Sequence, residues 1–397
     1  MSAKTTVILG GGFGGIATAN SLRGLLPSEH PITVVGDSSR FHVGAGKTWV
    51  MLGERTYEQI SQERTALLAP GIQFVKSTVQ SISLTERTVS AGTASLSWDF
   101  LVLALGADLN PAAVPGLAEA AHTFYTVEGA QRLKAALDQF SGGDVAIVIP
   151  RTPFKCPPAP YEAALLLHEA FRRRGLAGKV HLAIHTIEGA PMATAGPDMG
   201  QYIKNELAQR DIAFFPQRVV ARIDGAARRV VFEGGSEARY DLLIAVPPHA
   251  APKVVRDAQL INQAGWIPVD PKTMQVMQEA ASEVYAVGDV TSVPLPGRYR
   301  PDVGLVLPKA GVFAEAHGRI AAHQIAARIL GRAPEEAFDG KGYCFLEIGD
   351  QQAVKTDGSF FELPHPIMEK RVPDKAQFRD KLDWVDRLLR PLRSSPR

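Results

Sequence analysis

A cysteine stands at the turn that joins an apolar strand to a helix. Residues 145–150 read as a buried strand, and a helix is expected over residues 160–174. The turn between them contains Cys156 and has no G-x-G-x-x-G pattern. A helix N-terminus and the nearby cations Arg151 and Lys155 favour a thiolate, which is the reactive form of cysteine. The turn is therefore a candidate site for thiol chemistry.

Cys156 also has a simpler interpretation, because free cysteines often serve as small buried apolar residues. Its place in a proline-rich turn, outside any strand, favours reactivity. The chain has one other cysteine, Cys344, and two cysteines so far apart do not make a disulfide framework. If they pair in a reducing compartment, the pairing is expected to be chemical and not architectural. No His/Cys spacing resembles a zinc site, so no metal is expected.

Four further side chains are candidates for moving protons. Glu162 could do so beside Cys156 if burial raises its pKa, or it could only stabilise the first turn of its helix. Three histidines are weaker candidates, since each could simply end a loop: His122, His185 and His249.

The beginning of the chain carries a dinucleotide-binding pattern. Residues 5–9 read as a buried strand, and Gly10, Gly12 and Gly15 follow with the G-x-G-x-x-G spacing before a helix of small residues. Such glycines let backbone N–H groups and the helix N-terminus approach a diphosphate. Asp37 lies about 20 residues further on, the spacing expected of a ribose-binding acid, although it follows a glycine and does not end its strand directly.

The order of predicted strands indicates two nucleotide-binding folds. A strand and small-residue turn at 98–107 is repeated at 240–246, and residues 284–290 return the chain to the first fold. We expect an α/β protein with two Rossmann-like dinucleotide-binding domains, the first discontinuous, plus a C-terminal region. The predicted boundaries are 1–112 with 270–333 for the first domain, 113–269 for the second and 334–397 for the C-terminal region.

Composition excludes some classes of protein. The 397 residues carry 43 basic and 41 acidic side chains, a net charge of +2 that gives no argument for nucleic acid. No signal peptide and no membrane-spanning apolar run is visible. A cytoplasmic location, or attachment to a membrane surface from that side, is therefore expected.

The C-terminal region could supply such an attachment. Residues 378–393 form a basic amphipathic pattern that could lie on an anionic membrane, or dock on the body or on a second subunit in a homo-oligomer. Phe360 and Phe361 could wall an acceptor pocket or form a core pair. The apolar face of the tail pattern consists of Phe378, Leu382, Val385, Leu388, Leu389 and Leu392. The basic side chains lie away from that face: Arg379, Lys381, Arg387, Arg390 and Arg393.

Several motifs, which together span nearly the whole chain, resemble one family of flavoproteins. The chain is similar to sulfide:quinone oxidoreductase and to the flavin subunit of flavocytochrome c sulfide dehydrogenase. The cysteine segment and the PKAGVFAE segment are specific to that family, whereas the others are shared by many flavoproteins. The segments that carry the resemblance are the glycine turn at 10–15, LALG at 103–106, KCPPAPYE at 155–162, AVGD at 286–289, PKAGVFAE at 308–315, and Tyr343-Cys344 with EIGD at 347–350.

The resemblance implies an FAD site and a redox pair of cysteines. Lys309 should lie near the flavin ring, where a cation at a helix start would stabilise the anionic reduced flavin. Cys156 and Cys344 should face the flavin as a disulfide, which requires Cα atoms within about 7 Å of each other. The implied FAD contacts are Gly10, Gly12 and Gly15 at the diphosphate, Asp37 at the ribose, Gly106 at the turn after the strand, and Gly288 and Asp289 at the ribityl-phosphate region.

The implied activity is oxidation of sulfide to sulfane sulfur, with electrons passed through FAD to a quinone. The rival acceptor is a cytochrome c. Many quinone-linked members have a third cysteine that residues 121–143 lack, which favours the cytochrome. The missing export signal and the basic tail favour the quinone.

Two other functions stay open. An NADH-oxidising flavoprotein, such as a type II NADH dehydrogenase or a coenzyme A disulfide reductase, is disfavoured by the missing second glycine motif and by the absence of a cysteine in residues 41–46. A non-catalytic flavin sensor could use the cysteine pair to report redox state. Catalytic turnover with any acceptor would show that the protein is an enzyme and not such a sensor.

Overall fold

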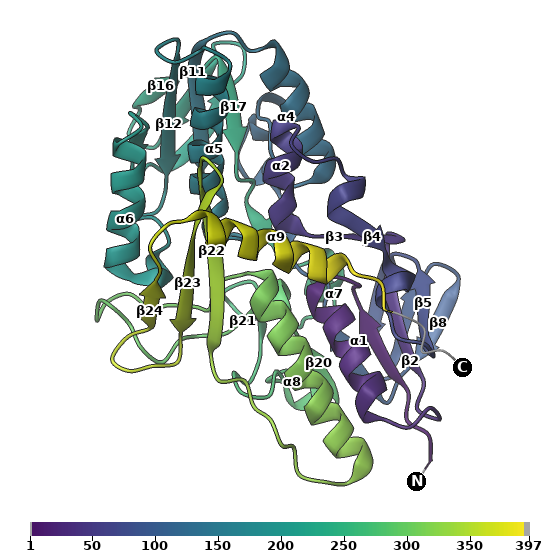
Figure 1. Cartoon of the computed structure of the whole chain (residues 1–397). Helices are drawn as coiled ribbons and strands as arrows, with labels where there is room; N and C mark the ends of the chain where they lie inside the picture. The colour runs from purple at the N-terminus through teal and green to yellow at the C-terminus, as the bar shows by residue number, and fades with distance from the viewer. Residues whose placement is uncertain (1, 393–397) are drawn as a thin grey trace.

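The computed structural model describes residues 2–392, and Figure 1 shows the course of the chain. The first layer is a five-stranded parallel sheet in the order β20-β9-β1-β2-β5. β1, β2, β9 and β20 are buried along their whole length, as expected for parallel strands covered on both faces. The strands are β1 (Thr6–Leu9), β2 (Ile32–Gly36), β5 (Ile72–Lys76), β9 (Phe100–Leu103) and β20 (Val284–Ala286).

Two helices pack together beside this sheet. α1 (Phe13–Leu25) and α8 (Gly311–Leu330) approach closely because Gly318 has no side chain: a Cβ there would come within 2.5 Å of the Gly14 carbonyl oxygen. Val255 and Leu260 also belong to this core. The chain therefore contacts the first layer again before the predicted boundary at residue 270.

The second layer is also a parallel sheet accompanied by helices. Its four parallel strands have the order β13-β12-β11-β17. The helix predicted for residues 160–174 is α5, and α5 is buried along most of its length. The strands are β11 (Gly143–Ile149), β12 (Val180–Thr186), β13 (Ala213–Phe215) and β17 (Leu242–Ala245), and the accompanying helices are α4 (Val127–Gln139), α5 (Ala159–Arg173) and α6 (Gly196–Ala208).

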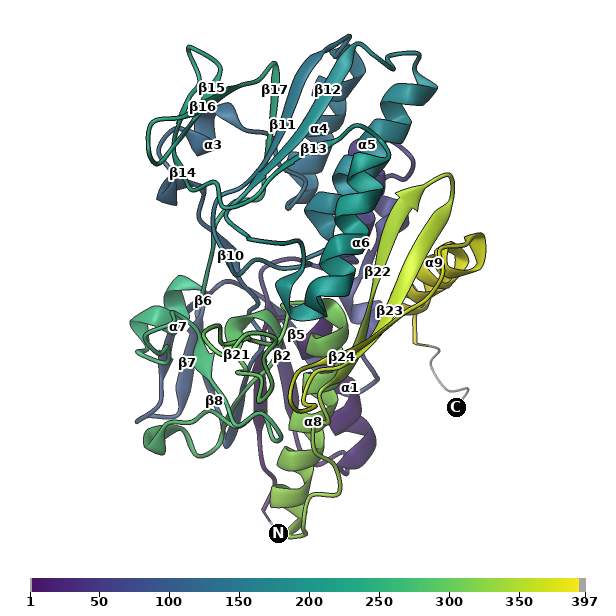
Figure 2. The same cartoon turned by 90° about the vertical axis from the view of Figure 1, so that its left-hand side faces the viewer.

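A C-terminal antiparallel sheet and a long helix complete the molecule. In Figure 2 they lie along one side of both parallel sheets. The predicted α/β class, with two Rossmann-like units and a C-terminal region, is confirmed. The elements are β22 (Lys341–Gly349), β23 (Gln352–Ser359), β24 (Ile367–Lys370) and α9 (Lys375–Leu389).

Short elements fill the connections. Two small antiparallel sheets are β6 (Val79–Ser83), β7 (Thr88–Ala91) and β8 (Ala94–Ser97), and β14 (Val220–Asp224), β15 (Arg229–Phe232) and β16 (Glu237–Arg239). The two-stranded pairs are β3 (Arg40–His42) with β4 (Ser61–Glu63), β10 (Asp108–Leu109) with β18 (His249–Ala250), and β19 (Ile267–Pro268) with β21 (Thr291–Ser292). The short helices are α2 (Lys47–Leu52), α3 (Leu117–Ala120) and α7 (Lys253–Asp257).

The tail helix docks on the body of the protein. α9 crosses the middle of the molecule in Figure 1 and begins at Asp374, whose side chain accepts a hydrogen bond from the Gln377 N–H at 2.7 Å. Val385, on the predicted apolar face, is fully buried. Lys381, predicted on the polar face, is only 1% exposed. Docking on the body is therefore the alternative that the structure supports. Arg393, at the end of the predicted pattern, lies outside the described residues.

No helix within residues 2–392 combines the length and the apolar character needed to cross a bilayer.

Candidate functional site

One large cavity collects most of the predicted site residues. It has a volume of about 740 Å³ and is lined by segments from both parallel layers and from the C-terminal region. Of the predicted cofactor and catalytic residues, Gly15 alone is not in its wall. The predicted residues that line it are Gly10, Gly12, Asp37, Gly106, Cys156, Glu162, Gly288, Asp289, Lys309 and Cys344.

The glycine turn has the shape of a diphosphate cradle. β1 ends at Leu9, and Gly12 is the N-cap of α1. A Cβ at Gly10 would overlap the Ala104 carbonyl oxygen, and one at Gly15 would overlap the Gly10 carbonyl oxygen. A Cβ at Gly12 would meet no atom within 4 Å. Two glycines therefore permit close backbone packing, whereas Gly12 leaves open space at a helix N-terminus, as a bound diphosphate needs.

Arg64 is a cation beside this cradle that sequence reasoning missed. Its side chain covers Gly11, is 7% exposed, and donates to the carbonyl oxygens of Ser38 and, at 3.0 Å, Arg40. Burial lowers the Arg64 pKa, and the negative charge of Asp37 opposes that shift. Arg64 and Asp37 thus stand together at the end of the cavity where the sequence predicts the ribose.

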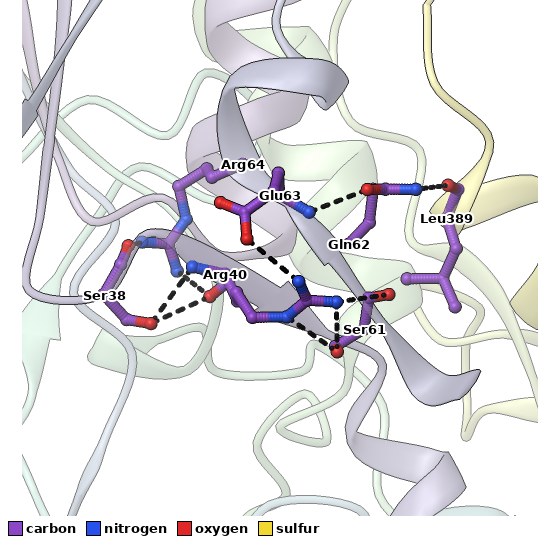
Figure 3. A network of polar contacts seen from close by, with 7 residues as sticks. All are labelled: Ser38, Arg40, Ser61, Gln62, Glu63, Arg64 and Leu389. Carbon is purple, nitrogen blue, oxygen red and sulfur yellow. Dashed lines mark hydrogen bonds and ion pairs between the residues drawn. The ribbon is translucent and has the colours of Figure 1, made fainter. Parts of the chain in front are cut away.

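Figure 3 shows the polar network around Arg64. Arg40 pairs with Glu63 at 2.9 Å and donates to the Ser61 hydroxyl. Gln62 donates to the carbonyl oxygen of Leu389 at 3.3 Å, at the end of α9. The network therefore joins this end of the cavity to the tail helix.

One carboxylate oxygen in the cavity wall is buried without a hydrogen-bond donor among the described residues. Asp289 Oδ1 accepts no hydrogen bond from any residue that the structure describes. Burial raises the Asp289 pKa, while Lys309, Lys155 and Lys47 lower it. A buried acceptor of this kind needs a donor. The hydroxyl groups of a ribityl chain would supply one, so this residue fits a flavin nucleotide.

Lys309 is fixed beside that carboxylate. Its ammonium donates to the carbonyl oxygens of Asp289 at 2.6 Å and Thr291 at 3.0 Å, and lies 3.4 Å from the centre of the Trp266 ring. Burial lowers its pKa to about 8. The Cys156 N–H donates to the Lys309 carbonyl oxygen at 2.7 Å, so the structure brings the predicted flavin lysine and the predicted redox cysteine together.

Cys156 differs from expectation in its protonation. Burial raises its pKa to about 12, with Glu162 adding to the rise, so the free thiol is protonated. The cations that oppose this are Lys381 and Lys47, and not the sequence neighbours of the cysteine. Arg151 turns away and donates to the Pro150 carbonyl oxygen. Cys156 also has a left-handed backbone (φ 58°), a strained conformation that is common at functional sites.

Cys344 lies on β22 and lines the same cavity. Both cysteines are free thiols in the structure. Burial raises the pKa of Cys344 to about 12, and the negative charge of Glu162 adds to that rise. Both thiols therefore line one cavity and pack against the same apolar core, although residue 344 comes from the C-terminal sheet.

Glu162 is buried, and three donors surround it. It accepts hydrogen bonds from the Lys381 ammonium at 2.9 Å, the Glu347 N–H at 3.0 Å and the Thr48 hydroxyl at 3.2 Å. Burial raises its pKa, as the proton-handling interpretation requires. Lys381, like Arg64, was not predicted as a site residue.

The three candidate histidines do not line the cavity. Burial lowers the pKa of His249 to about 3 and that of His185 to about 4, so both rings are neutral. His185 stacks on Phe215 with ring centres 4.8 Å apart. His122 is partly buried, and burial lowers its pKa as well. The alternative that each histidine simply ends a loop does not describe His185 and His249, which lie in the strands β12 and β18.

Lys47 is a second cation that sequence reasoning missed. It lies in the cavity wall, is 8% exposed, and donates to the Tyr125 carbonyl oxygen at 2.8 Å. Burial lowers its pKa to about 7, with the positive charge of Lys155 contributing. No motif marks this lysine, because its burial results from packing between α2 and distant residues.

We expect Lys47 to make the stability of the cofactor-free protein depend on pH. Above pH 7 the folded lysine loses its proton while the unfolded one keeps it up to about pH 10.5. The free energy of unfolding should therefore rise with pH in this window, by up to about 1.4 kcal/mol per pH unit. Lys47→Met should remove that rise in urea unfolding between pH 7 and pH 9. Lys179→Met, at an exposed position, is the control and should leave the rise unchanged. If the unfolding free energy rises equally with pH in Lys47→Met and in wild type, Lys47 is not its cause.

The matched families agree with this geometry. Residues 4–150 match the pyridine nucleotide-disulphide oxidoreductases. Residues 130–247 match the central region of the flavoprotein chain of flavocytochrome c sulfide dehydrogenase. The fold and the site thus define an enzyme of the flavin disulfide oxidoreductase class.

Individual relatives show which members of this enzyme class the chain is similar to. The sulfide-quinone reductase of Aquifex aeolicus is 27% identical over 381 residues, which cover 93% of this chain and 85% of the relative. The mitochondrial sulfide:quinone oxidoreductase of Mus musculus is 23% identical over 372 residues, 90% of this chain and 78% of the relative. The crystal structure of the Aquifex aeolicus sulfide:quinone oxidoreductase superposes with a TM-score of 0.85 at 25% identity, covering 97% of this chain and 90% of that one. Over most of its length the chain is thus similar to the flavoproteins of the sulfide:quinone oxidoreductase and flavocytochrome c sulfide dehydrogenase family, and the matched pyridine nucleotide-disulphide oxidoreductase family implies that it binds FAD.

Proposed function

We propose that the protein oxidises sulfide to sulfane sulfur through a disulfide of Cys156 and Cys344 and passes the electrons to a quinone. One observation carries the proposal: both thiols line the cavity that also contains the glycine cradle and Lys309. The similarity to sulfide:quinone oxidoreductases over most of both chains supports the choice of substrate and acceptor.

The sulfur step is a thiol–disulfide exchange. Hydrosulfide attacks one sulfur of the oxidised pair, a new S–S bond forms, and the bond between the two cysteines breaks. One cysteine then carries a persulfide and the other is a thiolate. Since burial disfavours a thiolate here, the positive charges of Lys381 and Lys47 are needed to stabilise it.

The residues that would hold FAD follow from the cavity wall. Gly10, Gly12 and Gly15 would hold the diphosphate, Asp37 and Gly106 would lie near it, and Gly288 and Asp289 would hold the ribityl-phosphate region; all of these except Gly15 line the cavity. FAD bound there would supply the oxidant: it would take up the two electrons released when the cysteine thiolate and the deprotonated persulfide join in a new S–S bond, and would pass them on one or two at a time to the acceptor. Lys309 places a fixed positive charge in the same part of the wall.

Glu162 is the proposed proton acceptor. Its carboxylate lines the cavity with both cysteines and is buried away from bulk water. The persulfide formed by hydrosulfide carries one proton, which must leave before the terminal sulfur can act as a nucleophile. Glu162 is placed to take that proton.

The wall near Cys344 supports a quinone as acceptor. It is formed by the aromatic and thioether side chains Tyr343, Phe345, Phe360, Met368 and Trp384. Such a wall suits a flat apolar ring. Of the two phenylalanines predicted as pocket walls, Phe360 lines the cavity and Phe361 does not; Phe360 also packs edge-to-face on Phe313, with ring centres 5.2 Å apart.

A cytochrome acceptor remains the second candidate. The match of residues 130–247 to the flavocytochrome c sulfide dehydrogenase flavoprotein favours it. So does the absence of a third cysteine. Reduction assays with a soluble quinone and with cytochrome c as competing acceptors would separate the two.

The proposal predicts that sulfide, and not NADH, reduces the bound flavin. In anaerobic stopped-flow experiments, sulfide should bleach the flavin absorbance rapidly. An equal concentration of NADH should leave it unchanged, because the turn at Cys156 lacks the glycines that a second dinucleotide needs. Fast bleaching by NADH would instead indicate an NADH-oxidising flavoprotein. No bleaching by either donor would favour the non-catalytic flavin sensor.

A further inference from the structure

A buried cluster of three charges connects the two cysteine-bearing elements with the tail helix. Lys381 of α9 donates to Glu162 of α5 at 2.9 Å and to Glu347 of β22. The Trp49 indole N–H, from α2, donates to Glu347 at 2.9 Å. None of the three charged residues is more than 4% exposed. Four elements, α9, α5, β22 and α2, therefore meet at one buried hydrogen-bonded cluster.

The cluster contains two carboxylates and one ammonium. Without its lysine it would hold two buried carboxylates side by side, and two such groups do not both ionise. The other titratable groups around it are the cavity residues Cys156, Cys344, Lys47 and Tyr125, and Glu54 with its neighbours Glu169 and Arg173 on the Glu347 side. Lys381 is therefore the cation in direct contact with both carboxylates among the described residues.

We propose that Lys381 and Glu347 are positioning residues that set the protonation state of Glu162, with Lys381 keeping it a carboxylate and Glu347 holding it ready to accept a proton. This inference rests on the proposed function, because it gives the site its proton acceptor. The persulfide Cys–S–S–H transfers its proton to the Glu162 carboxylate, giving Cys–S–S⁻ and a neutral carboxylic acid. No electrons move in this step.

The two partners act in opposite directions. Burial raises the Glu162 pKa; the positive charge of Lys381 lowers it, and the negative charge of Glu347 raises it. Removing the lysine charge should therefore leave Glu162 protonated at neutral pH. Removing the Glu347 charge should make Glu162 a weaker base. A purely structural role for the cluster predicts no such opposition of sign.

The test compares variants of the full-length, FAD-loaded protein by infrared spectroscopy. In the difference spectrum against wild type, Lys381→Met should show an additional C=O band of a protonated carboxyl group at neutral pH. The double variant Lys381→Met with Glu162→Gln should lose that band. Lys381→Arg keeps the charge and should resemble wild type, and Lys375→Met, exposed on the same helix, is the matched control. Absence of the band from Lys381→Met, or its persistence in the double variant, would overturn the proposal.

Activity provides the second measurement. The acidic limb of the pH profile for flavin reduction by sulfide should move up by about 1 pH unit or more in Lys381→Met and down in Glu347→Gln. Shifts of both variants in the same direction would contradict the inference. If Lys381→Met does not fold, the pH profiles of Glu347→Gln and Lys381→Arg still test the proposal. If sulfide never reduces the flavin, the proposed function fails, while the infrared result still tests the cluster by itself.

Discussion

Cys156→Ser and Cys344→Ser should each reduce the rate of flavin reduction by sulfide by on the order of 1,000-fold or more, to the background of free flavin. A serine hydroxyl cannot form the disulfide that hydrosulfide attacks, so neither variant can form the persulfide. The loss should be the same in both variants, since the two cysteines act as one unit. Anaerobic stopped-flow absorbance measures the rate.

Counting the free thiols tests the disulfide between Cys156 and Cys344 without a rate measurement. The chain has two cysteines, so the oxidised wild type should show no free thiol after denaturation and each serine variant should show one. FAD content should stay that of wild type, because neither cysteine belongs to the glycine cradle. Normal bleaching in Cys344→Ser would mean that Cys156 acts without a partner from the C-terminal sheet.

Gly15→Ala and Gly12→Ala should fail in different ways. A methyl group at position 15 overlaps the Gly10 carbonyl oxygen, so the variant should lose about 3 kcal/mol or more of unfolding free energy, even without FAD. At position 12 the methyl meets no protein atom within 4 Å and occupies the space proposed for the diphosphate. Gly12→Ala should therefore fold normally without cofactor but retain little FAD.

Two measurements separate these outcomes. Thermal unfolding of the cofactor-free proteins should place Gly12→Ala within about 0.5 kcal/mol of wild type and Gly15→Ala far below it. The ratio of flavin to protein absorbance after purification reports FAD retention. Full FAD occupancy in Gly12→Ala would place the cofactor elsewhere in the cavity.

The parts of the fold that sequence predicts well depend on local pattern. The apolar run at 145–150 and the periodicity of the following helix need only neighbouring residues, and the helix predicted for 160–174 is found at Ala159–Arg173. The glycine turn is likewise local, because its spacing is set by one strand-to-helix connection. The presence of Cys344 in the same cavity as Cys156 followed from family resemblance, since no local pattern connects them.

The electrostatics of the site could not be read from local pattern. Sequence neighbours suggested that Arg151 and Lys155 would lower the pKa of Cys156, yet burial dominates and the opposing charges come from Lys381 and Lys47. The helical pattern of the tail placed Lys381 on a polar face, but its partner Glu162 lies 219 residues away. Burial of a charge is a property of the whole fold, and only the packed structure reveals it.

Under the proposed mechanism, the place of β22 and α9 in the chain also determines when the protein can react. Both Rossmann-like layers, with Cys156, are translated before the segments that carry Cys344 and Lys381. A nascent chain stopped after α8 would possess the dinucleotide cradle and one sulfur, but no disulfide for hydrosulfide to open. Unfinished copies would therefore be unreactive toward sulfide by this route, and turnover would begin only when the ribosome has delivered the second thiol and its lysine.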